Sequence, residues 1–186
     1  MFNLVYLLLE QKLKSLVATD QTTLIRHVDR YRGQYELNQT EKQLPSVPSC
    51  LIEFNQADLR SNKGGAQLIK MPITLHIVTM ASSSSQQMVS APVHKGHSHE
   101  ELVEQIYLAL QGSRATAKDL AALASLPDSD NFQVYNTLNR TGYEQSFDYL
   151  PLLVTQVSFE TLAFDPAAVP KYQVVQATLK ASTTKL

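Results

Sequence analysis

The chain has 186 residues, which is long enough for one domain with a substantial hydrophobic core. Hydrophobic residues make up 44% of it and charged residues 18%, and 16 basic against 17 acidic side chains leave a net charge of −1. A dedicated nucleic-acid-binding protein normally carries a basic excess, so this balance argues against that class and against sequence-specific nucleic acid as a partner. The single cysteine, Cys50, excludes an intramolecular disulfide, and its apolar neighbours favour a buried hydrophobic side chain over a catalytic or redox thiol.

From the N-terminal residues we expect neither a transmembrane segment nor a signal peptide. Their longest apolar run, at 4–9, is far shorter than the ~20 residues that span a bilayer. Charged residues follow at Glu10, Lys12 and Lys14, and no basic segment precedes the run. We therefore expect no membrane partner and a location in a cytoplasm or in a particle assembled there.

A helix is predicted over residues 2–17. Its apolar side chains recur at spacings of three and four, which places them on one stripe: Leu4, Val5, Leu8, Leu9, Leu13, Leu16 and Val17. Residues 24–37 are then expected to be extended, with Gly33 at a bulge or turn. Tyrosine and arginine are interleaved there, and such a composition could stack on a nucleic acid, but Asp29 and Glu36 dilute the charge and favour an amphipathic strand.

Two runs, at 49–54 and 68–80, carry the clearest signal of a sheet. The first is apolar at nearly every position, which is typical of a central strand covered on both sides. In the second, isoleucine and leucine at 73, 75 and 77 alternate with Thr74, His76 and Val78. A period of two predicts a strand with one buried face.

Several residues in and between these two strands constrain them further. Glu53, inside the first strand, needs a partner or a path to water, and we predict an inter-strand or inter-subunit pair. The polar segment 55–67 is expected to be a loop in which Gly64 and Gly65 permit a tight turn, without the spacing of a phosphate-binding loop. Pro72 cannot donate a hydrogen bond to a neighbouring strand, so it predicts either a sheet edge or a bulge.

Residues 81–97 are expected to form a flexible loop, because they contain four consecutive serines and no periodicity. At its end, His94, His97 and His99 form an HxxHxH cluster of potential metal ligands. A closed site needs fixed geometry and usually further ligands, which the sequence does not supply, so we favour a loop without a metal and leave metal binding by these three residues open.

A second helix is predicted to begin at Ser98. Ser98 and Glu101 fit the S-x-x-E capping box, and Gly112 fits the position just after a helix end. The buried stripe of this helix is expected to consist of apolar residues at helical spacing: Leu102, Ile106, Ala109 and Leu110, with Val103 beside it. An insertion at 113–131 follows, with a short helical piece at 117–126.

The last third is expected to return to strands. We predict strands at 132–138, 152–164 and 172–179, with a polar bend at 139–148 between the first two. The layout predicts one domain over 1–186 of the α+β class, with a mainly antiparallel sheet and helices packed on one face.

Several phrases in this order resemble the tail-terminator, or tail-completion, proteins of long-tailed bacteriophages, including the Mu-like group. The phrases are PSCLIEF at 48–54, ITLHIV at 73–78, ALQG at 109–112, LNR at 138–140 and VSFET at 157–161. The resemblance covers roughly residues 1–165. The long Ser-rich loop at 81–97 and the insertion at 113–131 depart from the family pattern.

The resemblance implies a structural virion or prophage protein at the head-proximal end of the tail, present in the host cytoplasm during assembly. Such proteins form rings, often hexameric, that cap the tail tube and join it to the head connector, without a cofactor. A ring subunit needs interfaces that close by rotation. We expect four charged residues to serve such an interface: Arg60, Lys63, Lys70 and Glu53.

Two other classes remain open. A head–tail joining protein or a tail-tube subunit of a phage or related contractile apparatus would share the fold. A small hydrolase would use His76 or His27 with Asp29 and a serine. The sequence lacks the GxSxG, HExxH and paired-acid patterns, so we expect that the chain is not an enzyme.

Overall fold

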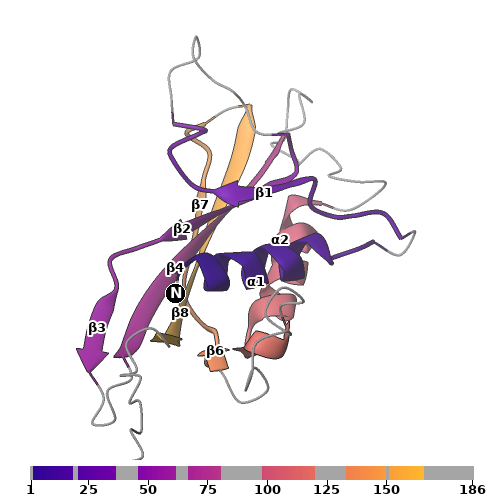
Figure 1. The fold of residues 1–186 in the computed structure, drawn as a ribbon. Helices are drawn as coiled ribbons and strands as arrows, with labels where there is room; N and C mark the ends of the chain where they lie inside the picture. Colours follow the sequence, from indigo (N-terminus) through magenta and orange to yellow (C-terminus); the bar gives the residue numbers. More distant parts are fainter. Residues whose placement is uncertain are drawn as a thin grey trace, which may run out of the picture.

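The computed structural model describes residues 2–18, 21–36, 46–61, 67–80, 98–119, 133–149 and 151–165. Within these residues the chain forms two α-helices, a short 3₁₀ turn and a single sheet (Figure 1). The elements follow in this order: α1 (Phe2–Lys14), β1 (His27–Arg30), β2 (Ser49–Phe54), β3 (Asp58–Ser61), β4 (Gln67–Met80), α2 (His99–Leu110), β5 (Ala115–Thr116), η1 (Ala117–Asp119), β6 (Gln133–Tyr135), β7 (Asn139–Ser146) and β8 (Leu152–Asp165).

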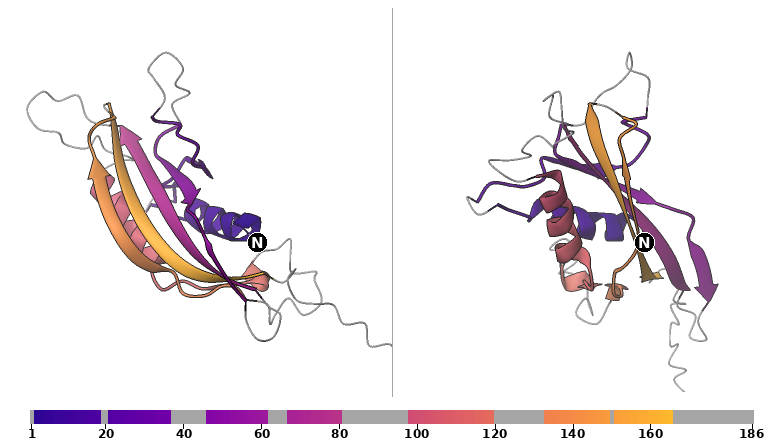
Figure 2. Two further views of the ribbon diagram at one scale, coloured as in Figure 1. Left: turned by 90° about the vertical axis from the view of Figure 1, so that its left-hand side faces the viewer. Right: turned by 180° about the vertical axis from the view of Figure 1, so that it is seen from behind.

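Two long strands, β4 and β8, form the centre of the sheet and pair along their whole length, from Gln67 with Asp165 to Met80 with Leu152. On one flank β2 and β3 pair with successive parts of β4, and on the other β7 and β6 pair with successive parts of β8. All pairs are antiparallel except β1 with β2. Figure 2 shows β4 and β8 as long curved strands in a curled sheet. The predicted α+β class with a mostly antiparallel sheet is therefore confirmed.

The sheet is interrupted beside Pro72. Phe54 pairs with Ile73 and Asp58 with Lys70, so three residues on the β2–β3 side face only Met71 and Pro72 on β4. The Asn55 amide donates to the Pro72 carbonyl across 3.1 Å. Of the two predictions for Pro72, the structure shows the bulge, and it lies opposite a central strand rather than at an edge.

The main core joins both helices to one set of β4 side chains. The odd-numbered positions of β4 share an apolar cluster with residues of α1, α2 and β8: Ile69, Met71, Ile73, Leu75 and Ile77. The helices contribute most of the predicted residues at three- and four-residue spacing, among them Leu9 of α1 and Ile106 of α2. Val17, predicted on the first stripe, lies beyond α1 and is 47% exposed. Each such fully buried side chain stabilises the fold by about 1.5–3 kcal/mol.

The ends of α2 are set by local chemistry. Ser98 and Glu101 make the predicted capping box, in which the Ser98 hydroxyl accepts from the Glu101 amide and the Glu101 carboxylate accepts from the Ser98 amide. Gly112 follows the helix with φ of 74°, a left-handed conformation that favours glycine. The predicted start and end of this helix are confirmed.

Several predicted boundaries are wrong. The polar bend expected at 139–148 is the strand β7, which lacks an apolar alternation because most of its residues are exposed. Part of the loop expected at 55–67 is the strand β3, which extends the line of β2 along β4. The extended segment expected at 24–37 is a strand only over β1 and then turns at Gly33, whose φ is 78°. The first helix ends at Lys14, three residues early.

Other predictions fall outside the described residues. These are the Ser-rich loop at 81–97, the Gly64–Gly65 turn, the strand at 172–179 and most of the insertion at 113–131. At the start of that insertion the structure shows β5 and η1, and it confirms a short helical turn only at Ala117–Asp119.

Candidate functional site

The second face of β4 is buried as well, which corrects the prediction of one buried face. Thr74, His76 and Val78 are 6%, 2% and 0% exposed. Residues from the turn after β1 cover this face and build a second, smaller apolar cluster: Tyr35, Leu51, Val78, Leu152 and Val154, with Tyr31, Val47 and Tyr149 packed against it. The sequence could not show this cover, because Tyr35 in the turn and His76 on β4 are 41 positions apart in the chain.

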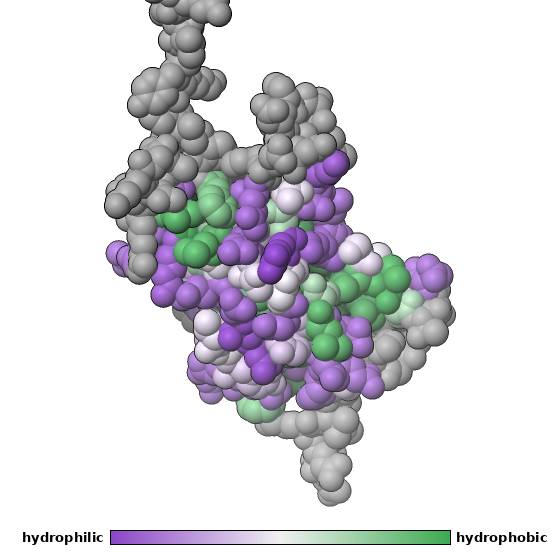
Figure 3. Space-filling model, turned by 90° about the horizontal axis from the view of Figure 1, so that it is seen from below, coloured by the Kyte–Doolittle hydropathy of each residue, from purple (hydrophilic) through white to green (hydrophobic). Residues whose placement is uncertain are grey.

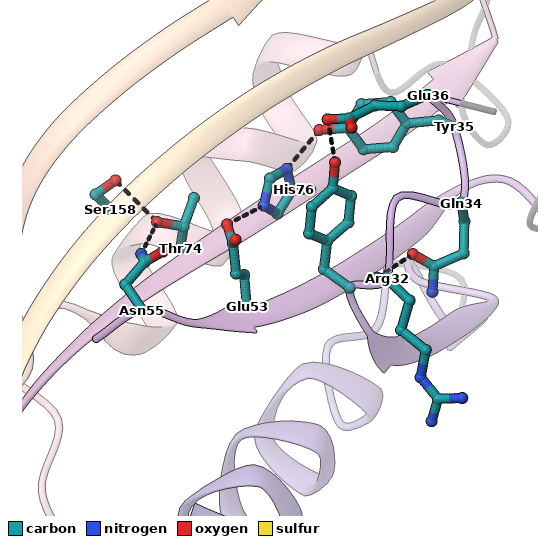
Figure 4. A network of polar contacts seen from close by, with 10 residues as sticks. Arg32, Gln34, Tyr35, Glu36, Glu53, Asn55, Thr74, His76 and Ser158 are labelled. Carbon is teal, nitrogen blue, oxygen red and sulfur yellow. Dashed lines mark hydrogen bonds and ion pairs between the residues drawn. The ribbon is translucent and has the colours of Figure 1, made fainter. Parts of the chain in front are cut away.

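His76 is the centre of a polar network on this face (Figure 4). Its Nδ1 lies 2.5 Å from the Tyr35 hydroxyl and its Nε2 lies 2.9 Å from Glu53 Oε2. The Tyr31 ring stacks on the imidazole, with centroids 3.9 Å apart and planes 14° apart. We call Tyr31, Tyr35, Glu36, Glu53 and His76 the His76 network.

The protonation of the network follows from its surroundings. Burial lowers the pKa of His76, and Glu53 only partly opposes this effect. A neutral ring satisfies every contact if Nε2 donates to the Glu53 carboxylate and Nδ1 accepts from Tyr35. Burial raises the pKa of Tyr35 to about 12, so its hydroxyl stays protonated and can donate the hydrogen bond to His76. The predicted partner of Glu53 is thus an inter-strand one, His76.

The network ties the turn at 31–36 to the sheet. The Tyr31 hydroxyl donates a hydrogen bond to the Glu36 carboxylate within the turn. Burial raises the pKa of Tyr31, and this hydrogen bond raises it further. The Tyr35 ring also packs edge-on against Tyr149, with centroids 4.7 Å apart. Stacking, apolar contact and the hydrogen bond from Tyr35 to His76 fix the turn over β4, while the His76–Glu53 bond joins β4 to β2.

Beyond the network the same face carries a strip of polar side chains, buried at Thr74 and more exposed toward Lys70. The Thr74 hydroxyl lies 2.9 Å from Asn55 Nδ2 and 3.3 Å from Ser158 Oγ, and Lys70 Nζ lies 2.9 Å from Glu160 Oε2. Antiparallel partners share a face, so the pairing of Glu53 with Thr74 and of Thr74 with Ser158 places these side chains on one side of the sheet. We call Asn55, Thr74, Ser158, Lys70 and Glu160 the polar strip.

The four residues predicted to form a subunit interface lie, as far as the structure describes them, in different parts of the fold. Glu53 and Lys70 lie on the same face, in the His76 network and the polar strip. Arg60 lies in β3, where it pairs with Leu68 of β4. Lys63 lies outside the described residues. The structure therefore places two of the four on the same face of the sheet, in different clusters.

The residues of the hydrolase alternative are separate. His76 is bonded to Tyr35 and Glu53, whereas His27 Nε2 lies 3.9 Å from Asp29 Oδ2 on β1. In the described part of the chain, no serine hydroxyl bonds either histidine. The geometry of His76 is that of a satisfied core histidine, with both ring nitrogens engaged.

The histidine at the start of α2 is also fully engaged. His99 is buried, with Nδ1 2.8 Å from the Thr79 hydroxyl and Nε2 2.7 Å from the Thr155 hydroxyl. Burial lowers its pKa. Because both ring nitrogens contact threonines, His99 joins α2 to β4 and β8 and has no nitrogen left for a metal. His94 and His97 lie outside the described residues.

Two further observations describe the chemistry of the described residues. They contain no group of three or more histidine, cysteine or acidic side chains placed to hold a metal ion. Cys50 is fully buried on β2, and burial raises the pKa of its thiol to about 12, so it stays protonated and behaves as a small apolar side chain.

The surface is mostly hydrophilic with separate apolar patches, as Figure 3 shows for the side seen from below in Figure 1. Large apolar side chains that are exposed include Leu108 at 60% and Tyr143 at 53%. None of the described helices is both long and apolar enough to cross a bilayer.

Comparison with known proteins does not assign the chain to a family. No protein-family model matches it, and no curated protein matches it significantly.

Proposed function

We propose that this chain is a structural virion or prophage protein that caps the tail tube and joins it to the head connector, acting through ring-type self-association. The observation that carries the proposal is the open sheet. Within the described residues its order ends at β1 on one side, and β7 pairs with β8 alone on the other. Strands with an unpaired side are the surfaces on which protein chains add to one another.

The positions of the resembling phrases support the proposal. Three of them fall on strands that are neighbours in the sheet, namely β2, β4 and β8. The ALQG phrase ends α2, and the LNR phrase leads into β7. Four of the five similar phrases therefore lie on the sheet, and one of these four leads into its open edge strand.

The finer architecture is part of the same proposal. In it, both helices cover one face of the sheet, as in the family that the sequence resembles, and the His76 network and the polar strip occupy the other. The apolar cluster shared by α1, α2 and the odd-numbered positions of β4 supports this arrangement.

Electron microscopy of the purified chain, alone and mixed with tail tubes assembled from the cognate tube protein, tests the function. A terminator is expected to form closed rings of about six subunits and to sit at one end of each tube. Long filaments of the chain alone would favour a tail-tube subunit, and rings that bind connectors but not tubes would favour a head–tail joining protein. A monomer that leaves the tubes unchanged would contradict the proposal.

A further inference from the structure

Among the described residues, the half of the sheet that contains the His76 network ends in two opposite edges. One row of paired residues crosses its five strands from β7 to β1: Tyr143, Val157, Leu75, Ile52 and Arg30. β7 runs parallel to β4, because both are antiparallel to β8, whereas β1 is parallel to β2 and so antiparallel to β4. Two copies placed side by side in the same orientation would therefore bring β7 of one against β1 of the next as antiparallel strands.

The regular part of the β7 edge is half-exposed to exposed and carries an acidic but no basic side chain. After a bulge between Arg140 and Gly142, five consecutive residues pair with β8 without a break. Glu144 is exposed in this stretch, and Asp148 follows it. The one basic residue of the strand, Arg140, lies before the bulge, where its guanidinium covers the Tyr107 ring at 4.2 Å. The regular part of the edge thus presents negative charge.

The β1 edge presents the opposite charge. Arg26 and Arg32 are exposed on either side of this strand. Arg30 is turned toward α1, with its guanidinium 2.5 Å from Asn3 Oδ1 and over the Tyr6 ring. The one acidic residue of the strand, Asp29, accepts from the Arg30 amide and lies near His27. The charge around β1 is therefore positive overall, with Arg26 and Arg32 exposed at its two ends against the single carboxylate of Asp29.

We infer that the acidic β7 edge of one copy binds the basic β1 edge of the next copy by strand addition, which names the self-interface of the proposed ring and rests on that function. Opposite charges steer and register such a contact. The contact is head-to-tail, so each added copy leaves one edge of each kind, and association continues until a ring closes. Because β1 has only four residues, a single β7–β1 contact is short and contributes little to the stability of the assembly. Closure of the ring would stabilise the assembly further, since each copy in a closed ring makes two such contacts.

Charge exchange between the two edges tests the inference. One variant carries Glu144→Lys and Asp148→Lys, and the other carries Arg26→Glu and Arg32→Glu. Each variant alone has two edges of like charge, so we expect its self-association, measured by sedimentation velocity, to weaken at least about tenfold. In a 1:1 mixture, each modified edge meets an edge of opposite charge, so we expect assembly to return. Glu104→Lys, on the exposed side of α2, is the control and should assemble like the unaltered chain.

The possible results distinguish a failure of the β7–β1 contact from a failure of the proposed function. Loss of assembly in each variant with recovery in the mixture would support the inference, since a folding defect would not be repaired by mixing. Variants that form rings like the unaltered chain would overturn the β7–β1 contact and leave the proposed function standing. An unaltered chain that neither self-associates at any concentration nor binds tail tubes would overturn both.

Discussion

The two faces of β4 are both buried, but different interactions hold them. The odd-numbered face packs in one apolar cluster with α1, α2 and β8. The even-numbered face packs against aromatic rings at one end, centres on the hydrogen bonds of His76 and ends in the solvent-exposed Lys70–Glu160 pair. The first face therefore depends on volume and shape, whereas the second depends on a few specific polar contacts.

The largest effect is expected on the odd-numbered face. Leu75→Ala should lower the free energy of unfolding by about 2–5 kcal/mol, because it leaves a cavity in the main apolar cluster. Leu108→Ala is the control, since this side chain is 60% exposed and should change the free energy by less than about 0.5 kcal/mol. Urea denaturation of both variants measures the difference, and equal effects would contradict the assigned core.

A smaller loss is expected from the His76 network. Tyr35→Phe keeps the ring but removes the hydroxyl that donates to His76, which should cost about 1–2 kcal/mol in the free energy of unfolding. The control is Tyr143→Phe, on the exposed edge strand, for which no change is expected. Hydrogen exchange at residues 31–36 should become faster in the first variant alone. If exchange there stays the same, the network does not anchor the turn.

The stability of the fold should depend on pH through its two buried histidines, His76 and His99. Burial lowers the pKa of His76 and of His99 below the ordinary value of 6.5, so the folded chain keeps both rings neutral while the unfolded chain protonates them. Their contribution is complete above about pH 6.5 and is lost as the pH falls below that value toward the folded pKa. We expect a lower free energy of unfolding at about pH 5.5 than at about pH 7.5.

Replacing the two histidines provides the control. In the double variant His76→Gln and His99→Gln, the fall in stability between the two pH values should be smaller than in the unaltered chain, even if the variant is less stable at both. An unchanged pH slope would show that other groups cause it.

The smallest effect is expected at the open end of the even-numbered face. Lys70 and Glu160 are 37% and 40% exposed, and such pairs contribute about 0.2–1 kcal/mol. Lys70→Ala should therefore change the free energy of unfolding by less than about 1 kcal/mol, and added salt should reduce the difference. A larger loss that salt leaves unchanged would mean that this end is more enclosed than the structure indicates.

The sequence predicts best what is determined locally. The capping box of α2, the glycine after it and the existence of the strand β4 rest on residues a few positions apart, and all three are found, although β4 is buried on both faces over residues 74–78. The cover of the second face could not be predicted, because Tyr35 and His76 lie 41 positions apart. In addition, the sequence around the tyrosines has the pattern of an amphipathic strand. β7 was missed for a related reason, since an exposed strand has no need of an apolar alternation.

The most direct test of the account is the mass of the purified chain in solution, measured by light scattering after size-exclusion chromatography over a wide range of concentrations. Self-association through opposite edges predicts a monomer and one closed species of about six copies, with few intermediates, because ring closure stabilises the complete ring. A strict monomer at every concentration, or a series of dimers that never grows, would contradict it.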